Sequence, residues 1–102
     1  MVIYRLLGGF PKQEQYGLTS QMQRAVISIP SNIAEGKERQ SDRDFARFIA
    51  IALGSLAELE TQLLIAQRLG YMVEADWQEA TAQADEIGKM LRSLHKTLSI
   101  TN

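Results

Sequence analysis

Several residue types that common protein chemistries require are absent or nearly absent from this sequence. Cysteine is absent, which excludes disulfide bonds, thiolate nucleophiles and thiolate metal sites. The single histidine, His95, has no second imidazole, which excludes a di-iron bundle site built from Glu-x-x-His on two helices. No strand pattern occurs, so there is no strand for a glycine-rich phosphate loop to follow. We therefore predict a protein that is not an enzyme, with no catalytic residue, metal, cofactor or small-molecule substrate.

Strong net charge and targeting signals are also lacking. The net charge of −1 argues against a dominant, non-specific nucleic-acid binder, although it leaves a local basic patch open. The N-terminus lacks the charged, apolar and small-residue regions of a signal peptide. Together with the missing cysteine, this predicts a cytoplasmic protein in a reducing compartment.

The sequence is rich in one feature, a helical pattern of apolar residues. These residues alternate at intervals of four and three, which predicts long helices packed at shallow angles. The first such heptad seam comprises Phe45, Ile49, Ala52, Leu56, Leu59, Leu63, Ala66 and Gly70. The second comprises Trp77, Ala80, Ala84, Ile87, Leu91, Leu94 and Leu98.

These seams and the short links between them define the predicted fold. The length fits one domain, and short links force neighbouring helices to run antiparallel. We predict an all-α, antiparallel up-down four-helix bundle with a shortened first helix, covering residues 1–102 as a single domain. The predicted helices span residues 2–8, 19–35, 42–69 and 74–98.

Capping residues mark the ends of the predicted helices. Thr19 or Ser20 should cap the second helix, because Ser20 followed by Gln23 fits a capping box. Ser41 should cap the third helix. Glycines should end both helices, the second at Gly36 and the third at Gly70.

The third predicted helix carries more apolar surface than one core can cover. Between residues 48 and 66, 13 of 19 residues are apolar, and they extend well beyond the seam. A helix that is apolar most of the way round must bury more than one face. We predict that the extra face meets another copy of the chain through Ile51, Leu64 and Ile65. Glu58 and Glu60 inside this run argue against a membrane span.

Two stretches of the sequence resemble a known protein family. They are residues 16–21 with 25–36, which end in Ser-Ile-Pro-Ser-Asn-Ile-Ala-Glu-Gly, and residues 54–63 with 69–71. Both resemble the small bacterial four-helix bundle proteins first noted as products of 23S ribosomal RNA intervening sequences. The accessory protein of diversity-generating retroelements is related to that family. The resemblance covers about residues 3–98.

The resemblance implies a four-helix bundle that assembles as a ring-shaped homopentamer without catalytic residues. It also implies a scaffold for nucleic acid or a partner protein. Family members have a longer first helix, and Met1 of this sequence falls in the middle of that helix. Val73 occupies the position before the fourth helix where a capping Ser or Thr is usual.

A group of polar residues surrounds Pro30 in the second helix. Pro30 lacks the N–H that would bond the Val26 carbonyl, which predicts a kink. Asn32 lies on the apolar side of the second helix. We favour a structural role for its amide over a ligand contact. The amide would either fix the register of the helix or bond the carbonyl that Pro30 leaves free. Ser28 and Ser31 should satisfy backbone groups at the kink. We predict a structural role for these four residues and for three glutamates. The predicted structural polar residues are Ser28, Pro30, Ser31, Asn32, Glu35, Glu58 and Glu60.

The three glutamates have different expected partners. Glu35 is four residues before Arg39 and should pair with it, in preference to serving as a site carboxylate. Glu58 and Glu60 point about 200° apart on their helix, so they form no catalytic pair. We expect each to meet arginine or hydroxyl groups of other helices or subunits.

Basic residues recur where the antiparallel fold should bring two helix segments together. Seven of the eleven basic residues share one end of the predicted bundle. This basic end comprises Lys37, Arg39, Arg43, Arg47, Lys89, Arg92 and Lys96. One interpretation is a solvated face with ordinary helix-terminal cations. The other is an anion-binding rim for RNA or DNA, multiplied by assembly. No aromatic residue interleaves with these charges in the pattern, so stacking on single-stranded bases is not predicted.

The sequence thus supports two functional hypotheses. The first is a homo-oligomeric helical scaffold, a pentamer by resemblance, that binds nucleic acid through the basic end. The alternative is a structural or protein-partner module in which these charges only maintain solubility.

Overall fold

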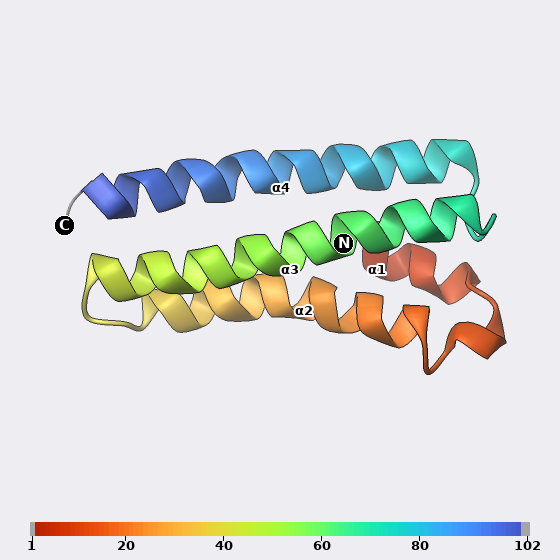
Figure 1. The fold of residues 1–102 in the computed structure, drawn as a ribbon, viewed down its shortest axis with the longest axis horizontal. Coiled ribbons are helices and arrows are strands. Elements are labelled where there is room, and N and C mark those ends of the chain that lie inside the picture. Colours follow the sequence, from red (N-terminus) through yellow and green to blue (C-terminus); the bar gives the residue numbers. More distant parts are fainter. Residues whose placement is uncertain (1, 101–102) are drawn as a thin grey trace.

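The computed structural model describes residues 2–100 as an elongated all-helical bundle of 45 × 24 × 17 Å. Its helices are α1 (Val2–Leu6), α2 (Leu18–Lys37), α3 (Asp42–Arg68) and α4 (Glu74–Ile100), with two 3-10 turns at Leu7–Gly9 and Lys12–Glu14. No strand occurs in this part of the chain, which confirms the predicted all-α class. Figure 1 shows the three long helices side by side and antiparallel, with α3 between α2 and α4.

The core forms where the predicted seams meet. The third-helix seam is buried from Ile49 to Ala66, and Leu56, Leu59 and Leu63 are at most 2% exposed. On α4 the seam alternates instead: Ala80, Ala84, Leu91 and Leu98 are buried, while Trp77, Ile87 and Leu94 are half-buried. The fourth helix therefore lacks part of the cover that a complete bundle would provide.

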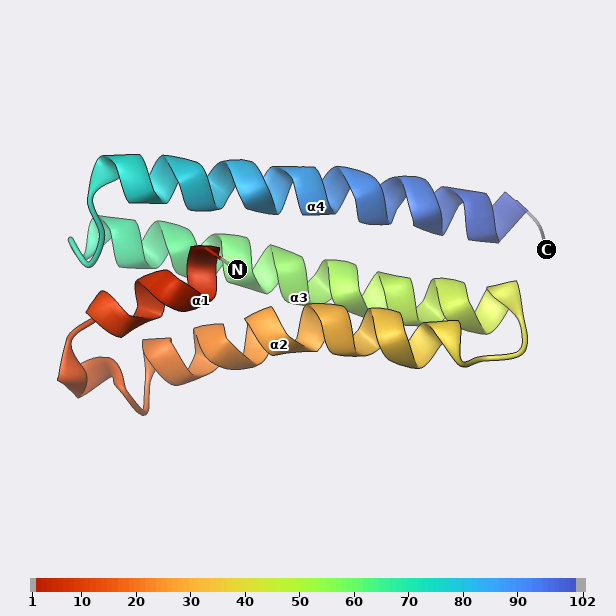
Figure 2. The same ribbon diagram turned by 180° about the vertical axis from the view of Figure 1, so that it is seen from behind.

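The short α1 explains this missing cover. It lies between α2 and α4 on the front of α3, begins near the middle of the bundle and runs toward the end that holds the α3–α4 connection (Figure 2). Ile3 and Leu7 anchor it, being 1% and 4% exposed. The α-helix ends at Leu6, two residues before the predicted end at residue 8, and Gly8 and Gly9 lie in the 3-10 turn that follows, ahead of Pro11.

The start of α2 corrects one prediction. The helix begins at Leu18 after the N-cap Gly17, and no N-cap side chain bonds its backbone. Instead, Glu14 Oε1 accepts a hydrogen bond from Leu18 N at 3.3 Å. The predicted cap at Thr19 or Ser20 is wrong, because both residues already lie inside the helix.

The end of α2 corrects a second prediction. The helix continues past Gly36 to Lys37, and Gly36 keeps a negative φ. A Cβ at Gly36 would stand 2.7 Å from Phe45 Cδ1 and 2.9 Å from Phe48 Cβ. The glycine therefore allows α2 and α3 to approach closely instead of stopping the helix. Pro30 lies inside α2, which runs unbroken through it.

The two ends of α3 match their predicted chemistry. Ser41 Oγ accepts a hydrogen bond from Asp44 N at 3.1 Å, which caps the first turn. At the other end Gly70 adopts φ +79°. Tyr71 N and Gly70 N donate to the carbonyls of Ala66 and Gln67, the bonding pattern of a Schellman motif.

Candidate nucleic-acid and subunit interfaces

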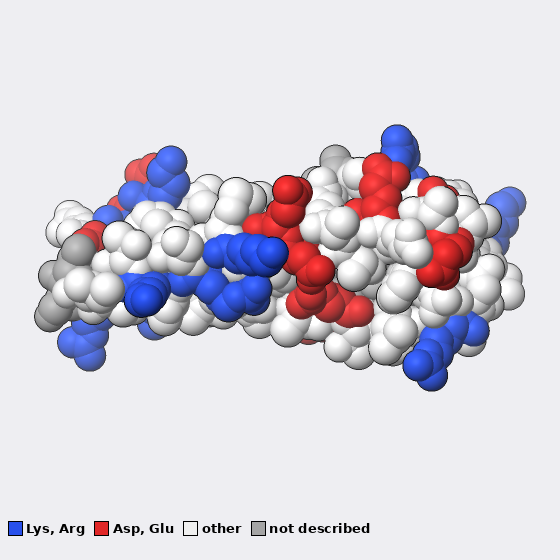
Figure 3. Space-filling view, turned by 90° about the horizontal axis from the view of Figure 1, so that it is seen from above, with Lys and Arg blue, Asp and Glu red and all other residues white. Residues whose placement is uncertain are grey.

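The fold brings all seven residues of the basic end together. The last turn of α2, the loop after it, the first turns of α3 and the second half of α4 occupy the same end of the bundle (Figure 1). All seven side chains are exposed. Figure 3 shows several basic side chains over one half of the α4 face and most acidic side chains across the middle and the other half, where further basic side chains lie at the edges.

The positive surplus of the basic end comes from α4. Residues 35–47 carry four basic and four acidic residues, so that segment is balanced. Residues 89–100 carry Lys89, Arg92 and Lys96 and no acidic residue. The surplus of three positive charges therefore lies on the second half of α4, where an anion would meet the least repulsion.

Phe48 organises two of the basic side chains. The guanidinium carbons of Arg39 and Arg47 lie 4.7 and 5.0 Å from the centre of its half-buried ring. Arg39 Nη2 also donates to Glu35 Oε1 at 2.6 Å, which is the predicted pairing. An aromatic ring thus does lie among the charges, contrary to the sequence pattern. Because guanidinium groups already cover it, this ring is not a free platform for a nucleobase.

The outward face of α3 remains uncovered in the protomer. Ile51, Leu64 and Ile65 are 44%, 42% and 45% exposed. At 100° per residue, Ile51 and Ile65 lie within about 40° of each other on the helix, whereas Leu64 lies about 100° from Ile65. The predicted interface residues therefore span about 140° of the helix surface away from the core, an arc that also contains the exposed Glu58 and Thr61.

The polar residues near Pro30 join α2 to α3. Ser28 Oγ and Ser55 Oγ lie 2.8 Å apart across the two helices. Asn32 Nδ2 donates to Ser28 O at 2.8 Å and to Ser28 Oγ at 3.0 Å. The Asn32 amide therefore has a structural role, but it donates to Ser28 and not to the Val26 carbonyl that Pro30 leaves free.

The other predicted structural polar residues lie at the surface. Ser31, Glu35, Glu58 and Glu60 are exposed, as is Pro30. Glu58 Oε1 accepts a hydrogen bond from Gln62 Nε2 of its own helix at 3.3 Å. This is a local contact within α3 and not a contact with another helix, while a contact with another subunit stays a prediction.

The sequence did not predict the hydrogen bond between Tyr71 and Glu14. Tyr71 Oη donates to Glu14 Oε2 at 2.6 Å, across 57 residues of sequence. This hydrogen bond, with smaller contributions from burial and the carboxylate charge, raises the pKa of Tyr71. Glu14 thereby links the turn before α2 to the α3–α4 connection while also holding Leu18 N. No local motif predicts a partner so distant.

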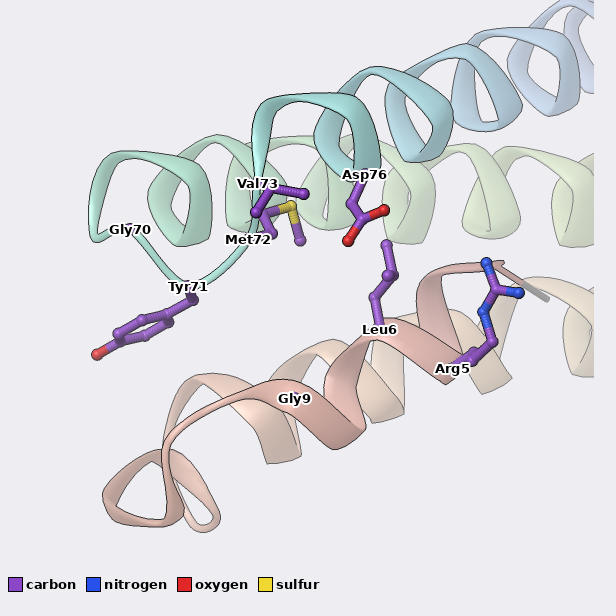
Figure 4. A pocket seen from close by; sticks show the side chains of 8 residues that line it. All are labelled: Arg5, Leu6, Gly9, Gly70, Tyr71, Met72, Val73 and Asp76. Atoms are coloured by element: carbon purple, nitrogen blue, oxygen red, sulfur yellow. The ribbon is translucent and has the colours of Figure 1, made fainter.

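A hollow of about 380 Å³ lies beside this connection, between α1 and the start of α4. In Figure 4, Leu6 and Asp76 point toward one another across it, while the Tyr71 ring points away. Arg5 Nη2 lies 4.0 Å from Glu79 Oε1 at the surface. The lining of the hollow contains no histidine, serine or threonine. No cluster of metal-ligating side chains occurs among residues 2–100.

The fold and these surfaces define a class of protein, the antiparallel helical bundle, here with a basic end and exposed apolar side chains on α3. A family-level match narrows the class: the sequence model of the 23S rRNA-intervening sequence protein family matches residues 1–93. The chain therefore belongs to that family. A comparison with curated proteins gave no match.

A solved structure supports the same family. It is a protein of unknown function from the S23 ribosomal protein family of Bacteroides thetaiotaomicron VPI-5482, and it is similar to this chain at 30% sequence identity. The similarity covers 91% of this chain and 84% of the other, with a TM-score of 0.81. The family and this relative are described without a known activity.

One helix, α3, has an apolar composition. Within the part of the chain that the structure describes, α3 is long and apolar enough to cross a membrane, with a mean hydropathy of 1.6 over its most apolar window. A third of that window is buried between the neighbouring helices. The core helix of a bundle passes the same test, so this is weak support for a span.

Proposed function

We propose that this chain is a non-enzymatic, homo-oligomeric scaffold of the cytoplasm that binds RNA or DNA through its basic end. The observation that carries nucleic-acid binding is the gathering of seven exposed basic residues by antiparallel packing. The exposed apolar face of α3 supports self-association. Five subunits is the number that the family resemblance implies. Repetition around a ring would multiply the surplus on each α4 into an extended positive field.

Light scattering on the purified chain tests the assembly. We expect a mass near five times the protomer mass of 11.4 kDa. Ile51→Asp combined with Ile65→Asp should yield a folded, smaller species, because both side chains are exposed in the protomer. Tyr16→Asp, at a loop side chain that is 90% exposed, is the control and should leave the mass unchanged. A wild-type chain that is monomeric at micromolar concentration would refute self-association.

Gel-shift titrations with a structured RNA and a DNA duplex over a salt series test the nucleic-acid proposal. Wild type should bind at low salt with an affinity that falls as salt rises. Arg43→Glu with Arg47→Glu, and separately Lys89→Glu with Lys96→Glu, should each weaken binding by about tenfold or more and lower the salt slope by about two.

The matched control changes the same charge at the opposite end of the bundle. Lys12 and Arg24 are exposed there, and Lys12→Glu with Arg24→Glu should retain most of the binding. If this control loses as much affinity as the basic-end variants, net charge alone explains the binding. If wild type binds neither nucleic acid at low salt, the structural or protein-partner role replaces the proposal.

A further inference from the structure

The surplus cations on α4 have no partner within the protomer. In the part of the chain that the structure describes, the side chains of Lys89, Arg92 and Lys96 form no ion pair and no hydrogen bond. They occupy positions i, i+3 and i+7 of one helix, so they form a single stripe about 10 Å long at 1.5 Å per residue. All three are exposed. Their charge is therefore available to an external anion.

Gly88 determines where the middle cation of this stripe lies. A Cβ at Gly88 would stand 3.0 Å from Arg92 Nη1 and 3.1 Å from Arg92 Nη2. The guanidinium group therefore lies against the backbone of its own helix, in space that any other residue would fill. Glycine is less favourable than alanine inside a helix, and here it lets the positive charge lie close to the surface of α4.

The basic end lies on open surface and not in a groove. Three hollows, of about 300, 380 and 480 Å³, occur among the described residues, and none of the seven basic residues lines any of them. The smallest is the apolar hollow between α2 and α4. Proteins that bind single strands commonly hold the strand along a positively charged groove. The basic end lacks that shape and suits a ligand with a broad charged surface.

Aromatic rings that could stack on bases are also not free at the basic end. The sequence has seven aromatic residues, and all of them lie within residues 2–100. Only Phe45 and Phe48 lie near the basic end, where both are half-buried and two guanidinium groups cover the Phe48 ring. The most exposed ring, Tyr16, precedes α2, whose first turn lies at the opposite end of the bundle (Figure 1).

Hydroxyl groups on the second half of α4 are engaged with the backbone of their own helix. Thr97 Oγ1 donates to Ser93 O at 3.1 Å, and Ser99 Oγ donates to His95 O at 2.8 Å. A hydroxyl has one proton to donate, so these two cannot also donate to the edge of a base. The basic end therefore offers positive charge for phosphate groups and few groups for bases.

Charge density then distinguishes the two forms of nucleic acid. A double strand carries one negative charge per about 1.7 Å of its axis, whereas each of its strands carries one per about 3.4 Å. Each phosphate contact also releases more counterions from a duplex, about 0.9 against about 0.7 for a single strand. Single strands compensate by stacking their bases on aromatic rings, and the basic end has no free ring for this.

From these observations we infer that the basic end binds the phosphate groups of double-stranded nucleic acid in preference to a single strand. This inference rests on the proposed nucleic-acid binding and names its ligand class. Duplexes of RNA and of DNA share the phosphate chemistry, so each is one arm of the test.

Fluorescence anisotropy with labelled oligonucleotides tests the inference. The probes are a duplex of about 20 base pairs and each of its strands alone, chosen to avoid self-pairing, in one DNA set and one RNA set. At about 3.4 Å per base pair this duplex is longer than the 45 Å bundle. At about 50 mM salt the duplex should bind at least about tenfold more tightly than either strand in one set or in both. The set with the larger ratio identifies the preferred sugar.

A variant that supplies the missing ring tests the physical reason. Ser93 is exposed on α4 between Arg92 and Lys96. Ser93→Trp should bind the single strands about fivefold or more tighter than wild type and leave duplex binding within about twofold, because a ring beside the cations can stack on a base. Ser93→Leu is the matched control, since it adds apolar bulk without a ring, and it should keep the wild-type ratio. Circular dichroism verifies that both variants fold.

The outcomes separate this inference from the proposed function. If the strands bind as tightly as the duplex in both sets, the preference is wrong while nucleic-acid binding stands. If Ser93→Trp and Ser93→Leu bind single strands equally, missing stacking is not the reason for the preference and the argument is overturned. If wild type binds neither form at low salt, the proposed function is wrong and this inference falls with it.

Discussion

Leu56→Asp will abolish folding of the protomer. Leu56 is 2% exposed at the centre of α3, and its Cδ2 stands 3.2 Å from where a Gly88 Cβ would be, in the contact between α3 and α4. Losing this side chain costs about 2–5 kcal/mol in burial and cavity, and an uncompensated carboxylate adds several more. A domain typically has about 5–15 kcal/mol of total stability, so the change removes most or all of it.

Far-ultraviolet circular dichroism with a urea titration measures this effect. We expect little helical signal and no cooperative transition from Leu56→Asp. Ile51→Asp is the matched control, because it introduces the same group on the same helix at a side chain that is 44% exposed. The control should keep its helical signal. A Leu56→Asp chain that unfolds at the wild-type urea concentration would show that α3 is not the core helix.

Gly36→Ala and Gly54→Ala will change stability in opposite directions. Both glycines lie inside helices, where alanine gains about 1 kcal/mol of intrinsic propensity. At Gly36 the added Cβ would meet Phe45 Cδ1 at 2.7 Å and Phe48 Cβ at 2.9 Å, so α2 and α3 must move apart. At exposed Gly54, an added Cβ would meet no other part of the protein within 4 Å.

The expected values follow from this difference in space. Overpacking costs about 1–3 kcal/mol and should outweigh the propensity gain, so Gly36→Ala lowers the free energy of unfolding. Gly54→Ala should raise it by up to about 1 kcal/mol, unless an assembled neighbour packs on that face. Denaturant midpoints of both variants at equal protein concentration provide the measurement. A stabilised Gly36→Ala chain would mean that the two helices do not approach as closely as described.

Much of the fold could be read from local patterns. The predicted third helix, residues 42–69, differs by one residue from Asp42–Arg68, because a heptad seam with a serine cap and a terminal glycine is a local signal. The start of α2 could not be read in the same way. Its backbone partner is Glu14, which Tyr71 orients from 57 residues away, and the serine that fits a capping box lies within the helix.

The candidate surfaces show the same division. The gathering of the basic end followed from antiparallel neighbours, since short links leave few alternatives. The position of Phe48 among the arginines did not, because it depends on where flexible side chains rest after α2 and α3 have packed. Gly36 is similar. A glycine at this position suggested a helix end, whereas the closeness of Phe45 to where its Cβ would be makes it a packing residue.

Periodic apolar residues, caps and link lengths were enough to establish the number of long helices, their direction and the excess of apolar surface on α3. These properties depend on neighbours within a few turns of the same chain. The apolar hollow between α2 and α4, the Glu14–Tyr71 link and the position of Phe48 among the arginines arose only when distant segments packed together. Solvent exposure at any residue depends on what every other helix covers, and a one-dimensional pattern does not contain that information.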